Sequence, residues 1–325
     1  MAKDALEYMY SSARIKAKEG AQGYEERLNS YLSCKSISQL CYLLMPGEEI
    51  SHREKREAVE KYFANKVSNA LSLIQEIAPE PRYFDFLLYE YDCCNLKTLI
   101  KCQIKGIDSD GMLYEYSSVS SDLLKEALEK RSFDGVMPRN MARTATEAID
   151  AFARTKDPKV IDLVLDRACF ADMLENAKLC GNKMAEGLVK ARIDSINIMT
   201  SKRISLSEIA DKVSIFDMAF IEGGALEKKL FLPMLEGEDK RLSDVLFGTD
   251  YNFDSIDKMT LSSLEKALDE RYLSIAREAK YVPFGFEVLC SYIVNTIFEA
   301  KNARIISASL ASGMSEEEIR ERVRF

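Results

Sequence analysis

Histidine, glycine and proline are scarce in this sequence of 325 residues, which has 1 histidine, 14 glycines and 7 prolines. A Cys/His zinc site needs several closely spaced ligands, and the 8 cysteines include no C-x-x-C pair. The sequence therefore predicts no bound metal. The glycines and prolines gather at expected turns such as GIDSDG (106–111) and KDPK (156–159). They leave long uninterrupted stretches for regular structure.

Long hydrophobic runs are also missing. The most apolar stretch, FGFEVLCSYIVNTIF (284–298), carries Glu287 and is too short to cross a bilayer. The N-terminal stretch is charged from its third residue, which predicts no secretory signal. We therefore expect no direct membrane insertion and a cytoplasmic protein whose eight cysteines stay reduced, several of them as core residues.

Recognisable catalytic motifs are absent as well. The single histidine, His52 in EEISHREK, has no credible nucleophile or acid partner and is interpreted as a solvated side chain. The segment EGGALEKK (222–229) lacks the G-x-x-x-x-G-K-[ST] frame of a phosphate loop and is interpreted as a loop before a helix. The sequence predicts no catalytic residue, no cofactor and no enzyme activity.

Positive charge is in deficit, with 45 basic against 53 acidic residues and a net charge of −8. Because binding to phosphates needs a basic surface, we expect no nucleic acid partner. The composition, 47% hydrophobic and 30% charged, is typical of a soluble globular protein. At this length two or three subdomains are expected.

Helical periodicity dominates what is present. Apolar residues recur at spacings of three and four, as in Phe286, Leu289, Ile293 and Ile297, whereas short Val/Ile alternations are almost absent. The sequence predicts an all-α protein. It also predicts a long terminal helix from Pro283 to Ser312, ended by Gly313, with its apolar side chains buried.

A short motif occurs three times. DCCNLKTLIK (92–101), DSINIMTSKR (194–203) and EAKNARIISA (299–308) each read acid, two variable residues and asparagine. The copies are about a hundred residues apart, which predicts three domains: 1–117, 118–218 and 219–325. Adjacent Cys93 and Cys94 are variable positions of this motif, which argues against redox chemistry as its purpose.

The segments beside the copies support this alignment of the three motifs. VLDRACFADMLE (164–175) and ALDERYLSIARE (267–278) precede the second and third copies, and they share Leu-Asp, an aromatic or large residue and a closing Glu at one constant offset. Behind those copies we expect two Ser-x-x-Glu capping boxes, Ser205 with Glu208 and Ser315 with Glu318.

What recurs is an acid and an asparagine one helical turn apart: Asp92/Asn95, Asp194/Asn197 and Glu299/Asn302. Asparagine is a poor residue inside a helix, so its recurrence indicates a tertiary role, such as bonding to a neighbouring backbone. Our first interpretation is that these pairs lock the helices of each repeat together. The alternative is that they line a surface that binds a partner.

The terminal segment 283–323 resembles that of the C-subunit family of V-type/A-type ATPases, the central-stalk component whose eukaryotic counterpart is the d subunit. The pattern includes a long helix with acid-x-x-Asn-x-Arg-Ile-Ile, a glycine and an acidic cap followed by Ile-Arg. The matching residues are Phe284, Gly285, Glu287, Glu299, Asn302, Arg304, Ile305, Ile306, Gly313, Glu318, Ile319 and Arg320. The resemblance extends over essentially the whole chain, although Met199 replaces the basic residue in the second copy.

This resemblance implies a non-catalytic rotor component: three similar helical domains around a pseudo-threefold axis, in a funnel shape. Its cavity would receive the central shaft (the D and F subunits), and its opposite face would rest on the membrane proteolipid ring. Such a socket couples ATP hydrolysis or synthesis to ion transport, at the periphery of the inner membrane. The repeated residues, together with Arg304, would then be structural or interface residues.

A generic helical adaptor is the alternative function. Solenoid adaptors stack many repeats of 30–45 residues, whereas three units of about a hundred residues favour the funnel.

Overall fold

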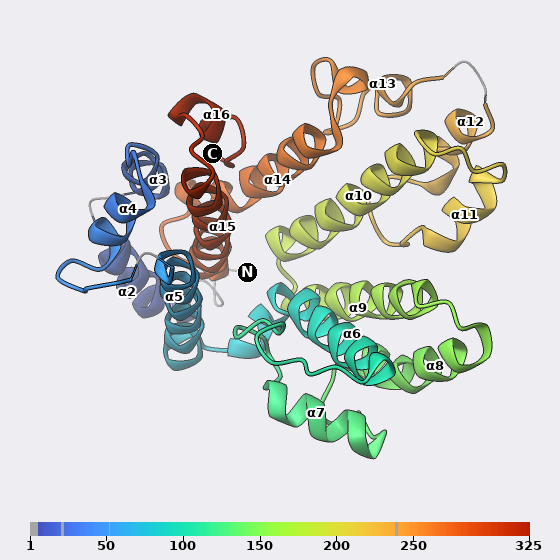
Figure 1. Cartoon of the computed structure of the whole chain (residues 1–325), viewed down its shortest axis with the longest axis horizontal. Coiled ribbons are helices and arrows are strands. Elements are labelled where there is room, and N and C mark those ends of the chain that lie inside the picture. Colours follow the sequence, from blue (N-terminus) through green and yellow to red (C-terminus); the bar gives the residue numbers. More distant parts are fainter. Residues whose placement is uncertain (1–5, 21–22, 52, 238–239) are drawn as a thin grey trace. The chain divides into compact units, whose positions relative to one another are not determined.

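The computed structural model describes residues 6–325 apart from 21–22, 52 and 238–239. Every regular element in this part of the chain is a helix, so the all-α prediction is confirmed (Figure 1). His52 lies outside the described residues. No helix in the described ranges is long and apolar enough to span a bilayer.

The chain forms two compact units: residues 1–81 with 266–325, and residues 82–265. The predicted boundaries at 117/118 and 218/219 both fall inside the second unit. The arrangement as three domains around a pseudo-threefold axis stays a prediction.

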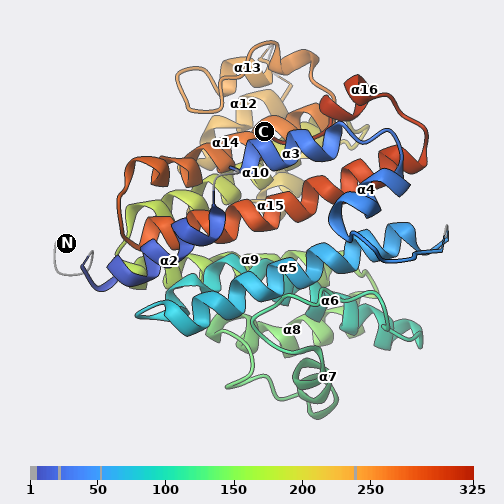
Figure 2. The ribbon, with the colours of Figure 1, turned by 90° about the vertical axis from the view of Figure 1, so that its left-hand side faces the viewer.

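The first unit joins the two ends of the sequence. Its long helices α5 (Lys55–Ile77) and α15 (Phe286–Ala311) pack side by side (Figure 2). The remaining elements are shorter and most of them pack on α15: α2 (Met9–Glu19), α3 (Tyr24–Leu32), α4 (Ile37–Leu44), η4 (Glu278–Tyr281) and α16 (Glu316–Arg320). Residues from both ends therefore share one core.

In the second unit α9 (Lys159–Cys180) is the central helix, in contact with α6 (Tyr89–Lys105), α8 (Arg139–Thr155) and α10 (Lys183–Ser205). The other elements are α7 (Ser121–Lys130), α11 (Lys212–Ala219), η2 (Lys228–Leu230), α12 (Leu232–Leu235), α13 (Leu242–Val245) and η3 (Ile256–Lys258). Two elements span the unit boundaries, η1 (Pro81–Leu87) and α14 (Leu261–Arg277).

Local sequence explains where the long helices begin and end. The Asn182 side chain accepts a hydrogen bond from the Met184 N–H and caps α10. Gly106 ends α6 in the left-handed region at φ 64°, and Gly313 follows α15 at φ 72°. Both glycines stand fourteen residues after the acid of their motif.

The terminal-helix prediction is confirmed with small shifts. The helix begins at Phe286 rather than Pro283, and it ends at Ala311. Its predicted core residues are buried except Ile297, which is half-buried. Ser315 and Glu318 form the expected reciprocal capping box on α16.

The second expected capping box, Ser205 with Glu208, is wrong. Ser205 is the last residue of α10, and its hydroxyl donates to the carbonyl oxygen of Lys202. The next helix, α11, begins only at Lys212 and is capped by Asp211, which accepts from the N–H of Ser214. A hydroxyl can bond backward within its own helix as readily as forward, so the pattern alone did not fix the helix start.

Candidate functional site

The three copies of the motif lie on the three long helices α6, α10 and α15. Asp92, Asn95, Asp194, Asn197, Glu299 and Asn302 are all buried, with at most 1% of their surface exposed. Six buried polar side chains on helices that already satisfy their own backbones need partners from elsewhere in the fold.

Each asparagine binds one residue further along the chain through both of that residue's backbone groups. The amide nitrogen donates to its carbonyl oxygen, and the amide oxygen accepts from its N–H. The pairs, with these two distances in order, are Asn95 with Tyr114 (3.0 and 2.8 Å), Asn197 with Ile221 (2.8 and 3.0 Å) and Asn302 with Arg324 (2.7 and 2.9 Å). We call this two-point bond the asparagine clasp. It holds an irregular segment against the side of a helix, where no backbone partner exists.

In the first copy the acid extends the clasp. Asp92 accepts hydrogen bonds from the N–H groups of Ser118 (2.9 Å) and Val119 (3.0 Å), and from the Ser118 hydroxyl (2.5 Å). These residues stand four and five positions after the clasped Tyr114. The Tyr91 ring packs edge-on against those of Tyr114 and Tyr116, so the clasped segment also covers an aromatic cluster.

The second copy repeats this geometry with a different sequence. Asp194 accepts from the N–H groups of Ala225 (3.1 Å) and Leu226 (3.0 Å), again four and five positions after the clasped residue, and from the Tyr251 hydroxyl (3.0 Å). A Cβ atom at Gly224 would lie 2.1 Å from Asp194 Oδ1. Only glycine fits there, which explains one glycine of the EGG turn.

The pKa values of both aspartates reflect their burial. Burial raises the pKa of Asp92 from 3.8 to about 6, although the hydrogen bonds from Ser118 and Val119 oppose this. Burial also raises the pKa of Asp194, against the same kind of bonds. Because the folded state binds these protons more tightly than the unfolded state, each aspartate lowers stability as the pH rises from 3.8 through its folded pKa.

In the third copy the acid is bound by side chains instead. Glu299 accepts from Tyr31 (2.6 Å), Lys66 (2.5 Å) and Arg27 (3.0 Å), which come from α3 and α5. Burial raises the pKa of Glu299, but the two cations and the hydroxyl outweigh it and the pKa lies below 4.5. Glu299 therefore ties three helices of the first unit together through charge.

The basic residue two positions after the asparagine does not have one common role. Lys97 forms an ion pair with Asp166 on α9 at 2.6 Å, whereas Met199 is buried. Arg304 is exposed, and no hydrogen bond or ion pair of its side chain occurs within the described residues. The structure thus does not bring Arg304 together with the clasp, and its role as an interface residue is a proposal.

The cysteines of the first copy belong to helix packing. All eight cysteines are free thiols. Cys93 donates to the carbonyl oxygen of Leu165 on α9 (3.6 Å), and Cys169 donates to that of Tyr89 on α6 (3.3 Å). Each cysteine therefore bonds to the carbonyl oxygen that lies one helical turn before the other cysteine. The two bonds join α6 to α9. No cluster of three or more potential metal ligands occurs in the described ranges.

The partners of the motif residues were not foreseen from the sequence. Most partner groups are backbone N–H and C=O, which every residue carries and which therefore leave no compositional trace. Gly224 is the exception. A Cβ atom at this position would collide with Asp194, so the sequence there must carry a glycine.

Comparison with known proteins assigns the chain to a class. It belongs to the ATP synthase (C/AC39) subunit family, whose sequence pattern matches residues 11–322. The resemblance drawn from the terminal segment and the three motifs is confirmed.

Individual relatives agree with this assignment. The chain is 23% identical to the C subunit of the V-type sodium ATPase of Enterococcus hirae, over 82% of this chain and 81% of that protein. It is 22% identical to the C subunit of the A-type ATP synthase of Methanocaldococcus jannaschii, over 98% and 86%. It is 21% identical to the same A-type protein of Pyrococcus abyssi, over 97% and 90%.

The clasp in the first unit predicts a clear stability effect. Asn302→Leu leaves the buried N–H of Arg324 without its partner and removes one of the two donors to the Arg324 carbonyl oxygen, which keeps the Tyr24 hydroxyl. It should lower the free energy of unfolding by about 1–3 kcal/mol. Asn295→Leu is the matched control on the same helix, because its Nδ2 makes one bond of 3.3 Å and its Oδ1 has no partner among the described residues. Urea unfolding measures both; equal losses would show that the clasp adds nothing to stability.

The charge cluster around Glu299 predicts a pH dependence. Glu299→Gln leaves two half-exposed cations without their acid and should lower stability at pH 7 by about 1–3 kcal/mol. The pKa of Glu299 is depressed, so its stabilisation is complete above 4.5 and is lost as the pH falls through the folded pKa. The difference between wild type and variant should therefore shrink in denaturant melts below that pH. A constant difference would contradict the assigned pKa.

The close approach at Gly224 predicts a third effect. Gly224→Ala forces a methyl group onto Asp194 and should lower the free energy of unfolding by about 1–3 kcal/mol. Gly23→Ala is the control, since its φ of −69° suits any residue and its Cβ would meet no atom within 4 Å. Thermal melts compare the two. If the two variants lose the same amount of stability, the segment 223–226 accommodates the methyl group without strain.

Proposed function

We propose that this protein is the non-catalytic rotor component of a V-type/A-type ATPase. In this role it is a socket that couples the central shaft, made of the D and F subunits, to the membrane proteolipid ring. The observation that carries the proposal is the family match across nearly the whole chain, together with relatives named as C subunits of a sodium ATPase and of ATP synthases.

The physical task of such a socket is to transmit torque without deforming. The described residues support this in two ways. Each motif helix is tied at two points by buried polar bonds that have few alternative partners. In the first unit, the buried Glu299 joins α15 to α3 and α5 through three side chains. Both features favour a stiff body.

The proposal extends to location and architecture. The protein would stand at the cytoplasmic face of the membrane, peripheral and held there by the ring. Its three repeats would close around a pseudo-threefold axis to form the funnel. The ion that moves, and the direction in which the machine runs, are properties of the ring and the head.

Reconstitution tests the coupling role. Adding the purified chain to shaft, head and ring subunits of the same organism should restore ATP-driven ion transport into vesicles. A complex without it should keep ATP hydrolysis by the head but lose transport. The chain alone should hydrolyse no ATP. If transport is equal with and without the chain, or if the chain binds neither the shaft nor the ring on size-exclusion chromatography, the proposal fails.

A further inference from the structure

Two buried thiols face each other where α6 packs on α9 in the second unit. Cys93 donates to the carbonyl oxygen of Leu165 at 3.6 Å, and Cys169 donates to that of Tyr89 at 3.3 Å. Both cysteines are 1% exposed. Burial raises the pKa of Cys169, and so does its hydrogen bond to the Cys93 thiol. The two sulfurs are therefore neighbours across the helix contact.

The direction of the two helices explains why the thiols meet. Along α6 the contacts pass from Tyr89 to Cys93, and along α9 they pass backward from Cys169 to Leu165. The helices therefore run antiparallel at this contact. Because the Cα–Cβ bond of a helical residue tilts toward the N-terminus of its own helix, two cysteines one turn apart on antiparallel helices tilt toward each other. The backbone thus directs both sulfurs to the same place.

An ion pair lies beside the Cys93 sulfur. Asp166 Oδ1 is 3.9 Å from Cys93 Sγ and 2.6 Å from Lys97 Nζ. Burial raises the pKa of Asp166, although Lys97 opposes this, so the carboxylate accepts a proton more readily than an exposed aspartate does. Burial lowers the pKa of Lys97, but Cys93 and Asp166 raise it by more. This ammonium group therefore stays charged next to the sulfur, and a neighbouring cation favours the reactive thiolate.

Solvent reaches the surroundings of Cys93 although it does not reach the sulfur itself. The side chain of Asp166 is 38% exposed, and Cys94 is half-buried. A small oxidant therefore approaches Cys93 along the exposed edge of the ion pair.

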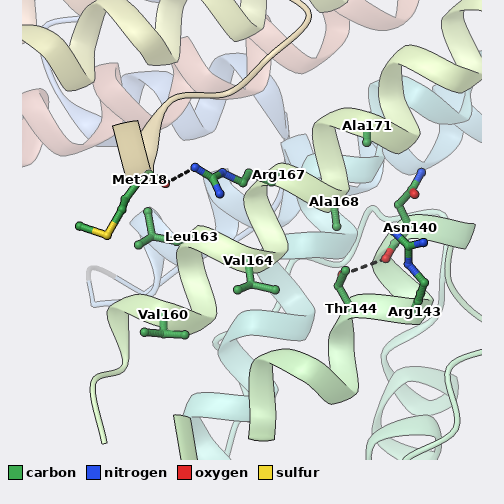
Figure 3. A pocket seen from close by; sticks show the side chains of 10 residues that line it. All are labelled: Asn140, Arg143, Thr144, Val160, Leu163, Val164, Arg167, Ala168, Ala171 and Met218. Atoms are coloured by element: carbon green, nitrogen blue, oxygen red, sulfur yellow. Dashed lines mark hydrogen bonds between the residues drawn. The ribbon is translucent and has the colours of Figure 1, made fainter. Parts of the chain in front are cut away.

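The opposite side of α9 lines a separate cavity of about 480 Å³ and carries no cysteine (Figure 3). Its lining includes Met218 of α11, which is 53% exposed. The rest of this face is mainly an apolar stripe of half-buried residues: Val160, Leu163, Val164 and Ala171. An oxidant in this cavity would meet the Met218 thioether but neither thiol of the pair.

We propose that Cys93 and Cys169 form a peroxide-sensitive dithiol, and that its oxidation to a disulfide joins α6 to α9 covalently. Hydrogen peroxide is the oxidant. Asp166 takes the proton of Cys93, and the thiolate attacks one peroxide oxygen. The O–O bond breaks, the sulfur becomes a sulfenic acid, and the other oxygen leaves as water with the proton from Asp166.

The second step closes the bond. The Cys169 sulfur attacks the Cys93 sulfur, so an S–S bond forms and the S–O bond breaks. The hydroxide leaves as water with the proton of Cys169. Overall the two thiols lose two electrons and two protons, and the peroxide becomes two molecules of water.

This chemistry belongs to the first copy of the motif alone. Ser195 and Ala300 occupy the position of Cys93 in the other two copies. The dithiol is therefore an addition to α6 and does not explain why the motif recurs. It also does not depend on the proposed function, because both helices belong to one unit of this chain.

Peroxide treatment of the purified full-length chain tests the pair. Free thiols are then blocked with N-ethylmaleimide, and the digested chain is analysed by mass spectrometry. We expect the peptide with Cys93 to be joined to the peptide with Cys169, with a loss of two hydrogens, and dithiothreitol to separate them. The oxidised chain should melt about 5 °C above the reduced chain, because a cross-link constrains the unfolded state. Sulfoxide at Met218 confirms that the oxidant has acted.

Matched variants identify the sulfur and the charge beside it. Cys93→Ser, the residue of the second copy, should abolish the link, whereas Cys94→Ser should keep it. Lys97→Met, again the residue of the second copy, should slow formation of the link roughly tenfold. Lys101→Met is its control, because it removes an ion pair with Asp162 between the same two helices and should leave the rate unchanged. Thermal melts of the reduced variants establish that they are folded.

Three results would overturn the proposal. The first is oxidation of Met218 without any link between Cys93 and Cys169. The second is a link that persists in Cys93→Ser, which would assign the reaction to Cys94. The third is an equal rate in the two lysine variants, which would exclude the thiolate route. If Cys93→Ser does not fold, Cys169→Ser replaces it and should also form no link.

Discussion

The need to satisfy buried carboxylates and amides on the three motif helices determines where several irregular segments of this structure lie. A helix consumes its own backbone groups, so Asp92, Asn95 and their counterparts must find donors and acceptors on other segments. Asparagine can offer one donor and one acceptor side by side, the same pattern as a neighbouring strand. A helix thereby holds an extended segment although the described part of the chain contains no sheet. The irregular stretches after α6 and α11 depend on this bond for their position.

The three copies differ in how they neutralise the acid, and the difference follows from what packs beside each helix. Asp92 and Asp194 face backbone N–H groups, which carry no charge, so burial raises their pKa values. Glu299 has one more methylene and reaches Lys66 and Arg27, so its pKa falls. The same motif therefore favours stability at opposite ends of the acidic pH range in the two units.

The sequence was sufficient for features that repeat or are local, and insufficient for features that depend on a distant partner. The helical class, the terminal helix and the Ser315 cap rest on periodicity and short-range bonds, and these predictions hold. The Ser205 cap failed because a hydroxyl can donate to a carbonyl of its own helix as well as accept from an N–H further on. The clasped residues Tyr114, Ile221 and Arg324 contribute only backbone atoms, so no side-chain pattern could have marked them.

The contacts of α9 in the second unit differ between its two sides. The face of α9 toward α6 is closed by thiol–carbonyl bonds and the ion pair of Lys97 with Asp166. The face toward α8 and α11 keeps an apolar stripe with arginines at its rim. α9 is therefore joined to α6 by directional bonds, whereas the apolar stripe that it turns toward α8 and α11 is only half-buried.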